Sequence, residues 1–320
     1  MSQGASFFLF QNKIRTIKRH HKLNPGKSMI RIGVDLGGTK IEAAALDDRG
    51  QTLVRKRIPT PGTYSDMVAE TVELVTGLEQ ALGTRARIGL GHPGSINPDS
   101  QVIRGANSTW LNGQHLAADI CAALDRPVRC ANDADCFALS ESVDGAGAKE
   151  HIVFGVILGT GVGGGIVIDG KPLGGAQNIA GEWGHTALPW LTQDEYPGPA
   201  CWCGKSGCVE AWLSGPAIAA DFGRRTGLDC QSQDILADET ELDRYAGRLA
   251  RALSTVINII DPDVVVLGGG VSNTPGLAQR VQTALPAHVF SDVLTTRVIR
   301  HKHGDSSGVR GAAMLWNDAQ

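Results

Sequence analysis

One unit that occurs twice restricts the fold of this chain more than any other feature: an apolar strand, a glycine-rich turn with a threonine, and a second strand. The first copy spans residues 30–46 with its turn at 35–40, and the second spans residues 152–168 with its turn at 159–165. Each turn leads into a strand, whereas Rossmann and Walker loops need a helix after the glycines. The pattern therefore favours phosphate-binding hairpins. The repeat predicts two related halves that grip one ligand between two domains.

Other periodic segments extend this unit into an alternating α/β pattern. Apolar runs predict further strands, at residues 52–58, 87–90, 128–131 and 264–267. Apolar positions at helical spacing predict helices, at residues 66–82, 137–143, 242–260 and about 309–316. We expect Ser65 to be the N-cap of the first of these helices.

A chain of 320 residues is long enough for two domains with separate cores. The pair Ala146-Gly147 marks a change in composition and a possible hinge. We expect a small α/β domain of residues 29–148 and 305–320, to which the last helix returns. Residues 149–304 form the expected large α/β domain.

The first 28 residues differ from the rest of the chain. They hold six Lys or Arg and no acidic residue, and they show no sustained period. We interpret residues 1–28 as a disordered extension outside the fold, with a targeting peptide or an upstream start codon as alternatives. The remainder is acidic, which argues against an enzyme that acts on nucleic acid.

The chain has seven cysteines, and four of them lack metal-ligand spacing: Cys121, Cys130, Cys136 and Cys230. We expect these four to be free thiols, which fits a reducing cytoplasm. The apolar run at residues 7–10 is too short for a secretory core or a membrane span. A cytoplasmic protein without a membrane partner is therefore expected.

A metal-ligand pattern lies between residues 181 and 210. His185 precedes a glycine-punctuated knuckle that contains Cys201, Cys203 and Cys208. Three cysteines and one histidine form one of the standard closed tetrahedral zinc shells. The alternative is three buried cysteines and an unrelated histidine, but this clustering has no packing rationale. We expect a structural zinc that presents the flanking carboxylates of Glu182 and Glu210 to a ligand.

Three further features leave two interpretations open. Asp133 follows the strand at 128–131 and is either the N-cap of the next helix or a base aimed into a cleft. The polar loop at 107–113 is either a surface turn or a binding loop. A third glycine turn, Gly268-Gly269-Gly270, either permits close packing of a strand on a helix or leaves room for a base or ribose.

Taken together, these motifs resemble the sugar kinases of the ROK family, in that family's order and over essentially all of residues 29–320. The matching segments are Asp35-Leu-Gly-Gly-Thr-Lys40, Asn132-Asp133, Gly159-Thr160-Gly161, Gly181-Glu182-x-Gly-His185, the cysteine knuckle with Glu210, and Leu267-Gly-Gly-Gly270. Residues 106–113, 188–190 and 303–311 are most similar to bacterial fructokinases of the manno(fructo)kinase type. N-acetylglucosamine kinases are the nearest alternative. One departure is His92, where the family usually has an apolar residue.

The resemblance implies an actin-like, ribonuclease H-like fold of two α/β domains with a zinc loop. It implies that Asp133 is the catalytic base, which reduces its capping role. It also implies sugar contacts from Asn107, Asn132, Asp133, Glu182, His185 and Glu210. ATP and Mg²⁺ are then held through Asp35, Gly37, Gly38, Thr39, Lys40, Gly159, Thr160, Gly161 and Gly163, and through Gly268, Gly269 and Gly270.

The expected reaction is ATP-dependent phosphorylation of a hexose, with D-fructose giving fructose 6-phosphate as the first expectation. Phosphorylation of N-acetylglucosamine, mannose or glucose is the alternative. The same family contains sugar-responsive repressors, but these need an N-terminal module of roughly 60 residues or more, and only 28 residues precede the first strand. A repressor or a non-catalytic sensor is therefore less favoured. The resemblance also implies a homodimer.

Overall fold

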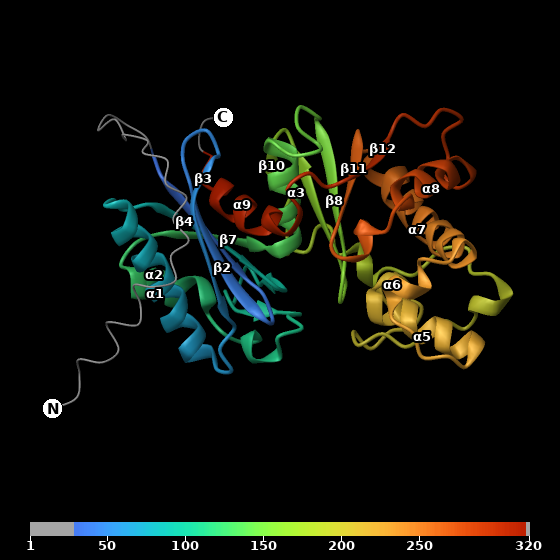
Figure 1. Ribbon diagram of the computed structural model, residues 1–320, viewed down its shortest axis with the longest axis horizontal. Coiled ribbons are helices and arrows are strands. Elements are labelled where there is room, and N and C mark those ends of the chain that lie inside the picture. Colours follow the sequence, from blue (N-terminus) through green and yellow to red (C-terminus); the bar gives the residue numbers. More distant parts are fainter. Residues whose placement is uncertain (1–28, 318–320) are drawn as a thin grey trace.

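The computed structural model describes residues 29–317, so the predicted extension at 1–28 and residues 318–320 lie outside the described part. Two five-stranded mixed sheets form the frame of two lobes (Figure 1). The first sheet has the order β3-β2-β1-β4-β7, with β3 (Thr52–Pro59), β2 (Lys40–Leu46), β1 (Arg31–Leu36), β4 (Arg87–His92) and β7 (Val128–Asn132). The second has the order β10-β9-β8-β11-β12, with β10 (Lys171–Pro172), β9 (Val162–Ile168), β8 (Ile152–Leu158), β11 (Val264–Gly268) and β12 (Arg297–Arg300).

The two sheets share one topology. In the first, β1 pairs antiparallel with β2 and parallel with β4. In the second, β8 pairs antiparallel with β9 and parallel with β11. Each predicted strand–glycine–strand unit is thus a hairpin at the middle of its own sheet. The repeat seen in the sequence is a structural duplication.

Helices cover both sheets and close the crossovers. In the first lobe they are α1 (Tyr64–Leu82) and α2 (Leu116–Leu124), and in the second α4 (Glu210–Leu213), α5 (Gly215–Thr226), α6 (Ser232–Ile235), α7 (Glu239–Ile260) and α8 (Leu277–Ala284). The prediction that Ser65 caps α1 is wrong, because Thr63 accepts the backbone N–H of Asp66 and the helix already begins at Tyr64. A two-stranded ribbon, β5 (Ser95–Ile96) with β6 (Ile103–Arg104), lies outside both sheets.

Two helices cross between the lobes. α3 (Asp133–Val143) follows the last strand of the first sheet but packs on β8 and β9 of the second. α9 (Ser307–Met314) follows the last strand of the second sheet but packs on β1 and β4 of the first. The two helices also pack against each other, and a Cβ at Gly311 of α9 would lie 1.7 Å from the carbonyl oxygen of Cys136 in α3. Only glycine permits so close an approach.

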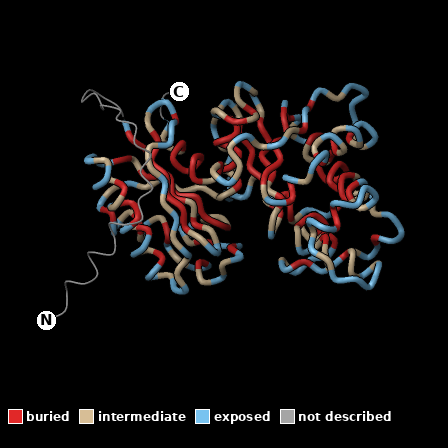
Figure 2. The backbone as a smooth tube through the Cα atoms, viewed as in Figure 1, coloured by how far each residue is buried: buried red, intermediate tan, exposed pale blue. Residues whose placement is uncertain are grey.

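The hydrophobic core has three parts. One fills the first lobe between its sheet and α1 and α2, one fills the second lobe around α7, and a third joins residues of α3, α9 and both sheets. Figure 2 shows buried chain along the strands of both lobes and along the helices between them. No helix among residues 29–317 is long and apolar enough to cross a membrane.

Candidate functional site

A cavity of about 530 Å³ lies where the two lobes meet. Its lining includes all six residues predicted to contact a sugar, Asn107, Asn132, Asp133, Glu182, His185 and Glu210. The second glycine hairpin also lines it, through Gly159, Thr160, Gly161 and Gly163. Asn107 and Asp133 come from the chain around the first sheet, whereas Glu182 and Glu210 come from the second lobe. Residues distant in the sequence therefore face one space.

Asp133 is the first residue of α3, at the end of β7. The N-cap is its neighbour Asn132, whose side-chain oxygen accepts the backbone N–H of Ala134 (2.8 Å). The interpretation of Asp133 as the N-cap is therefore wrong, although its own carboxylate also accepts that N–H at 2.8 Å. Burial raises the pKa of Asp133 to about 6, against this hydrogen bond. A carboxylate with this pKa is a candidate general base.

Asn132 also holds the neighbouring loop that lines the cavity. Its side-chain amide donates to the carbonyl oxygen of Gly94 (2.8 Å). Asn132, which is predicted to contact the sugar, therefore also binds the start of α3 and the loop after β4. The preceding His92 is buried, and burial lowers the pKa of His92 to about 4. Its imidazole is therefore neutral at physiological pH.

The first glycine hairpin lies beside this cavity and does not line it. Asp35 lies in the buried strand β1, one residue before its end, and burial, followed by the negative charge of Asp133, raises the pKa of Asp35 to about 7. Asp35 pairs with Gly91 of β4, and Gly91 pairs with Ala131 of β7, two residues before Asp133. Gly38 and Thr39 are exposed, Gly37 and Lys40 are half-buried, and the N–H of Gly37 donates to the carbonyl of Lys40 (3.0 Å). The tip of the hairpin is accessible to a ligand.

The third glycine turn is largely explained by packing. A Cβ at Gly268 would lie 2.4 Å from the Phe137 ring of α3, and one at Gly269 would lie 2.3 Å from the Leu158 carbonyl oxygen. Gly269 also has a φ of +81°, which favours glycine. Gly270 alone faces open space. Of the two interpretations of this turn, close packing accounts for Gly268 and Gly269.

The predicted zinc ligands gather at one point. The candidate ligand atoms of His185, Cys201, Cys203 and Cys208 all lie within 4.8 Å of one another. The Sγ atoms of Cys203 and Cys208 are 3.6 Å apart, and the Cys201 Sγ is 3.7 Å from the His185 Nδ1. Tetrahedral zinc with bonds of about 2.0–2.3 Å separates its ligand atoms by about 3.5–3.8 Å. The four side chains fit a zinc ion.

Glu210 joins this cluster to the second hairpin. One carboxylate oxygen accepts the backbone N–H of Val162 (2.9 Å), and the other accepts the indole N–H of Trp202 (2.5 Å). Trp202 also makes an edge-on contact with the His185 ring (centroids 4.9 Å apart). The sequence analysis did not identify Trp202 as a site residue. The only feature of the sequence that could have identified Trp202 is its position between two predicted zinc ligands, Cys201 and Cys203.

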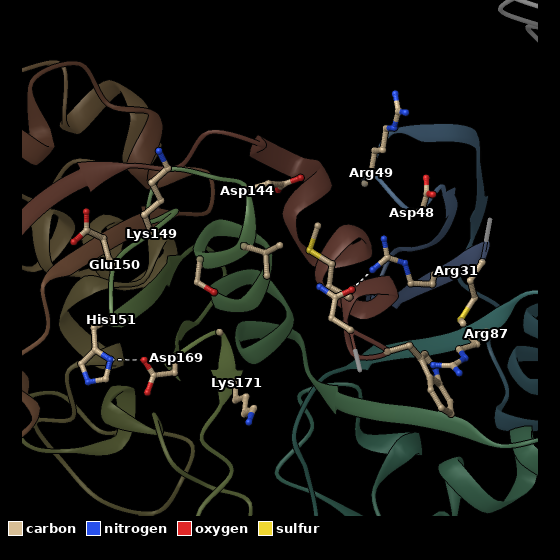
Figure 3. A pocket seen from close by; sticks show the side chains of 18 residues that line it. Arg31, Asp48, Arg49, Arg87, Asp144, Lys149, Glu150, His151, Asp169 and Lys171 are labelled. Carbon is tan, nitrogen blue, oxygen red and sulfur yellow. Dashed lines mark hydrogen bonds and ion pairs between the residues drawn. The ribbon is translucent and has the colours of Figure 1, made fainter. Parts of the chain in front are cut away.

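A larger cavity, of about 1120 Å³, lies at the C-terminal ends of α3 and α9. Its labelled side chains are charged and of both signs, among them Arg31, Lys149, Asp144 and Asp169 (Figure 3). None of the predicted site residues lines it. The smaller cavity, which holds the candidate base, is therefore the better candidate site.

The two lobes, their central hairpins and the cavity between them define a two-lobed α/β protein of the actin-like type. The chain belongs to the ROK family, whose profile matches residues 31–319. N-acetyl-D-glucosamine kinases of Salmonella gallinarum and Shigella boydii are both 40% identical to it over 296 residues, which cover 88% of this chain and 98% of theirs.

Solved structures agree with this assignment. The ROK hexokinase from Thermus thermophilus superposes with a TM-score of 0.78 at 30% identity, over 89% of this chain and 97% of that one. A ROK family glucokinase from Streptomyces griseus, in complex with glucose and AMPPNP, gives 0.74 at 27% identity, over 89% and 98%. A ROK family transcriptional regulator, a homolog of the E. coli MLC protein, shares the fold at 22% identity (TM-score 0.76, over 91% and 78%).

Proposed function

We propose that this chain is an ATP-dependent sugar kinase that transfers the γ-phosphoryl group of ATP to a hydroxyl of a hexose. The observation that carries the proposal is the shared cavity, in which the candidate base, the predicted sugar contacts and a glycine hairpin face one another. Phosphoryl transfer requires little covalent chemistry from the protein. An interlobe cleft that positions two substrates suits such a reaction.

Asp133 accepts the proton of the attacking sugar hydroxyl. Its raised pKa of about 6 leaves it ionised at neutral pH while keeping it a better base than an exposed aspartate. Backbone N–H groups of Gly38, Gly161 and Gly163 hold phosphate oxygens, and Thr39 and Thr160 add hydroxyl donors. The N–H of Gly37 does not take this role because the carbonyl oxygen of Lys40 already accepts it. The N–H of Val162 is excluded from this role because Glu210 already accepts it.

Two metal ions complete the proposal. Asp35 holds Mg²⁺, which in phosphoryl transfer neutralises charge on the β- and γ-phosphates. His185, Cys201, Cys203 and Cys208 hold a structural zinc. The hydrogen bond from Trp202, which lies between two of these ligands, fixes the Glu210 carboxylate. The zinc stretch thereby shapes the sugar-binding wall through its own side chains.

N-acetylglucosamine is the proposed sugar. Its support is the full-length similarity to N-acetyl-D-glucosamine kinases, and these relatives give no support to the first expectation of fructose. A cavity of about 630 Å³ adjoins the site and shares Gly105, Glu182, His185 and Trp202 with it. This space accommodates a substituent larger than a hydroxyl group.

A coupled ADP-release assay tests the proposal. N-acetylglucosamine, fructose, mannose and glucose are each supplied with ATP and Mg²⁺, with and without a zinc chelator. We expect the highest kcat/KM with N-acetylglucosamine. A higher value with fructose would restore the first expectation, and no ADP release with any hexose would refute the kinase assignment.

Assembly and domain closure are part of the same proposal. We take residues 29–148 with 305–320, and residues 149–304, as two domains that close on the substrates, and we expect a homodimer without a nucleic-acid partner. Sedimentation gives the oligomeric state. A gel-shift assay with DNA distinguishes the kinase from a repressor.

A further inference from the structure

Glu141 is the most heavily hydrogen-bonded buried carboxylate near the crossing of the two lobes. It lies near the end of α3 and is completely buried. One carboxylate oxygen accepts the backbone N–H groups of Ala146 (2.8 Å) and Lys302 (2.9 Å). The other accepts the backbone N–H of His303 (3.0 Å) and the hydroxyl of Ser307 (2.8 Å). Few side chains accept hydrogen bonds from four donors. All four donors must be in place to offset the free-energy cost of removing the Glu141 carboxylate from water.

These donors come from two segments that are distant in the sequence and meet around Glu141 and the neighbouring Asp144, which accepts from the side chain of Lys302 (2.8 Å). Ala146 belongs to the turn after α3, the possible hinge of the sequence. Lys302, His303 and Ser307 belong to the connection by which the chain passes from β12 to α9, back to the first sheet. A Cβ at Gly145 would lie 2.3 Å from the Glu141 carboxylate, so the turn wraps directly over it. Glu141 therefore fastens this second crossing of the chain to α3.

Both helices joined by Glu141, α3 and α9, lie close to candidate site residues. Asp133 starts the same helix, about 12 Å from Glu141 at 1.5 Å per residue. Ser307 starts α9, and a Cβ on the next residue, Gly308, would lie 2.8 Å from a carboxylate oxygen of Asp35. The position of α9 relative to α3 thus sets the position of Asp35 relative to Asp133.

We propose that Glu141 is a positioning residue, which holds the start of α9 against α3 so that Asp35 and Asp133 are correctly spaced when the lobes close. The inference deepens the proposed kinase function and rests on it for its kinetic consequences. Glu141 lines none of the three described cavities, so we expect no contact with substrate. Its effect is expected in the assembled, closed state rather than in the binding of either substrate.

The test compares Glu141→Gln with Glu79→Gln in the full chain. Glu79 is a matched control, because it also accepts a backbone N–H (Ala86, 2.6 Å) and pairs with an arginine (Arg126), but entirely within the first lobe. We expect Glu141→Gln to lower kcat at least tenfold, with KM for hexose and ATP within threefold of wild type. The Mg²⁺ concentration for half-maximal rate rises, because Asp35 shifts. Glu79→Gln keeps kcat and the Mg²⁺ requirement within twofold.

Two readouts do not depend on activity. Hydrogen exchange of the Lys302 and His303 amides accelerates in Glu141→Gln but not in Glu79→Gln. In small-angle scattering, we expect the wild type to contract when hexose and a non-hydrolysable ATP analogue are added together, and Glu141→Gln to contract less. Absence of wild-type kinase activity would count against the proposed function, while these two readouts still test Glu141.

The inference is overturned if folded Glu141→Gln matches wild type in kcat, Mg²⁺ requirement and contraction. If that variant does not fold, Ser307→Ala decides, since it removes one of the four donors and leaves the carboxylate intact. A threefold or larger loss of kcat with unchanged KM in Ser307→Ala supports the proposal. Wild-type kinetics in Ser307→Ala would then refute it.

Discussion

Glu210 accepts a hydrogen bond from the backbone N–H of Val162 at 2.9 Å, so the residue that follows the Cys/His cluster is tied to the second glycine hairpin. A Cβ on the adjacent Gly161 would lie 2.7 Å from the same carboxylate oxygen. The proposed zinc stretch and a proposed phosphate hairpin are therefore one connected unit. We therefore expect loss of the metal to weaken the binding of both substrates, because the Glu210 carboxylate connects the two sites.

Cys203→Ser tests this connection. We expect the purified variant to lose zinc, measured by elemental analysis, and to show a KM for hexose raised by about 10- to 100-fold, the range found when groups that support a metal site are removed. Because Glu210 also holds Val162, a smaller rise in KM for ATP follows. Cys230→Ser, a half-buried cysteine outside the cluster, is the control. Retention of zinc, or an unchanged hexose KM after zinc loss, would contradict the clamp.

Asp133→Asn tests the catalytic base. Removing a general base typically costs about 10²- to 10⁴-fold in rate, so we expect kcat to fall by that order while hexose binding and zinc content persist. Asp135→Asn is the matched control, two residues later on the same helix, where burial likewise raises the pKa of the aspartate to about 7. If kcat falls by this factor in Asp135→Asn and not in Asp133→Asn, Asp135 is the base.

The pH dependence of kcat/KM gives an independent check. A general base acts in its ionised form, and the pKa of Asp133 is raised to about 6. Activity should therefore be constant above this pH and fall tenfold per pH unit below it. Saturating Mg²⁺ keeps Asp35 ionised during the measurement, because a bound cation favours the charged carboxylate. An acid limb near pH 4, typical of an exposed aspartate, would show that Asp133 is not the titrating group.

Glu195 carries a prediction about stability. It is buried and accepts hydrogen bonds from Arg248 (2.8 Å) and Arg251 (2.7 Å). Glu195→Gln removes the carboxylate that pairs with Arg251 and one of the two that pair with Arg248, which keeps Asp221 (2.8 Å). Breaking a buried pair typically costs about 3–5 kcal/mol. Denaturant unfolding at pH 7 measures this loss. Asp194→Asn, at the exposed neighbouring pair with Arg244, should change stability little.

Glu195 also determines how this difference in stability depends on pH. Burial raises the pKa of Glu195, but the arginine hydrogen bonds outweigh burial and lower the pKa to about 2. A depressed carboxylate pKa contributes stability that is present above the unfolded-state pKa of about 4.3. The difference between wild type and Glu195→Gln should therefore shrink as the pH falls from 5 towards 2. A difference that persists at pH 2 would indicate packing rather than charge.

Much of the frame could be predicted from the sequence, because it depends on local pattern. The hairpins at β1–β2 and β8–β9 follow from apolar alternation around glycine turns, and the Cys/His cluster follows from ligand type and spacing. The start of α3 was predicted too late, at Phe137, because the charged residues Asp133 and Asp135 hide the helical period. Capping by Asn132, rather than apolar spacing, sets that boundary.

The remainder depends on contacts that leave no local signal. Gly268 faces Phe137, so a glycine that suggested ligand contact instead permits packing of β11 on α3. Three of the four donors to Glu141 are backbone N–H groups, which every residue but proline possesses. Trp202 reaches Glu210 only because the cysteine knuckle turns the chain back on itself. Tertiary geometry, and not residue type, assigns these roles.

The shared topology of the two sheets has a consequence for how such a protein diversifies. In the first lobe, the crossover from the third to the fourth strand of the sheet, residues 60–86, contains only α1. In the second lobe, the equivalent crossover, residues 173–263, contains the Cys/His cluster, Glu182 and Glu210. The sheet itself does not require this insertion, since the first lobe closes without it. Mutations that change the preferred sugar can accumulate in this crossover while both halves of the duplicated frame stay intact.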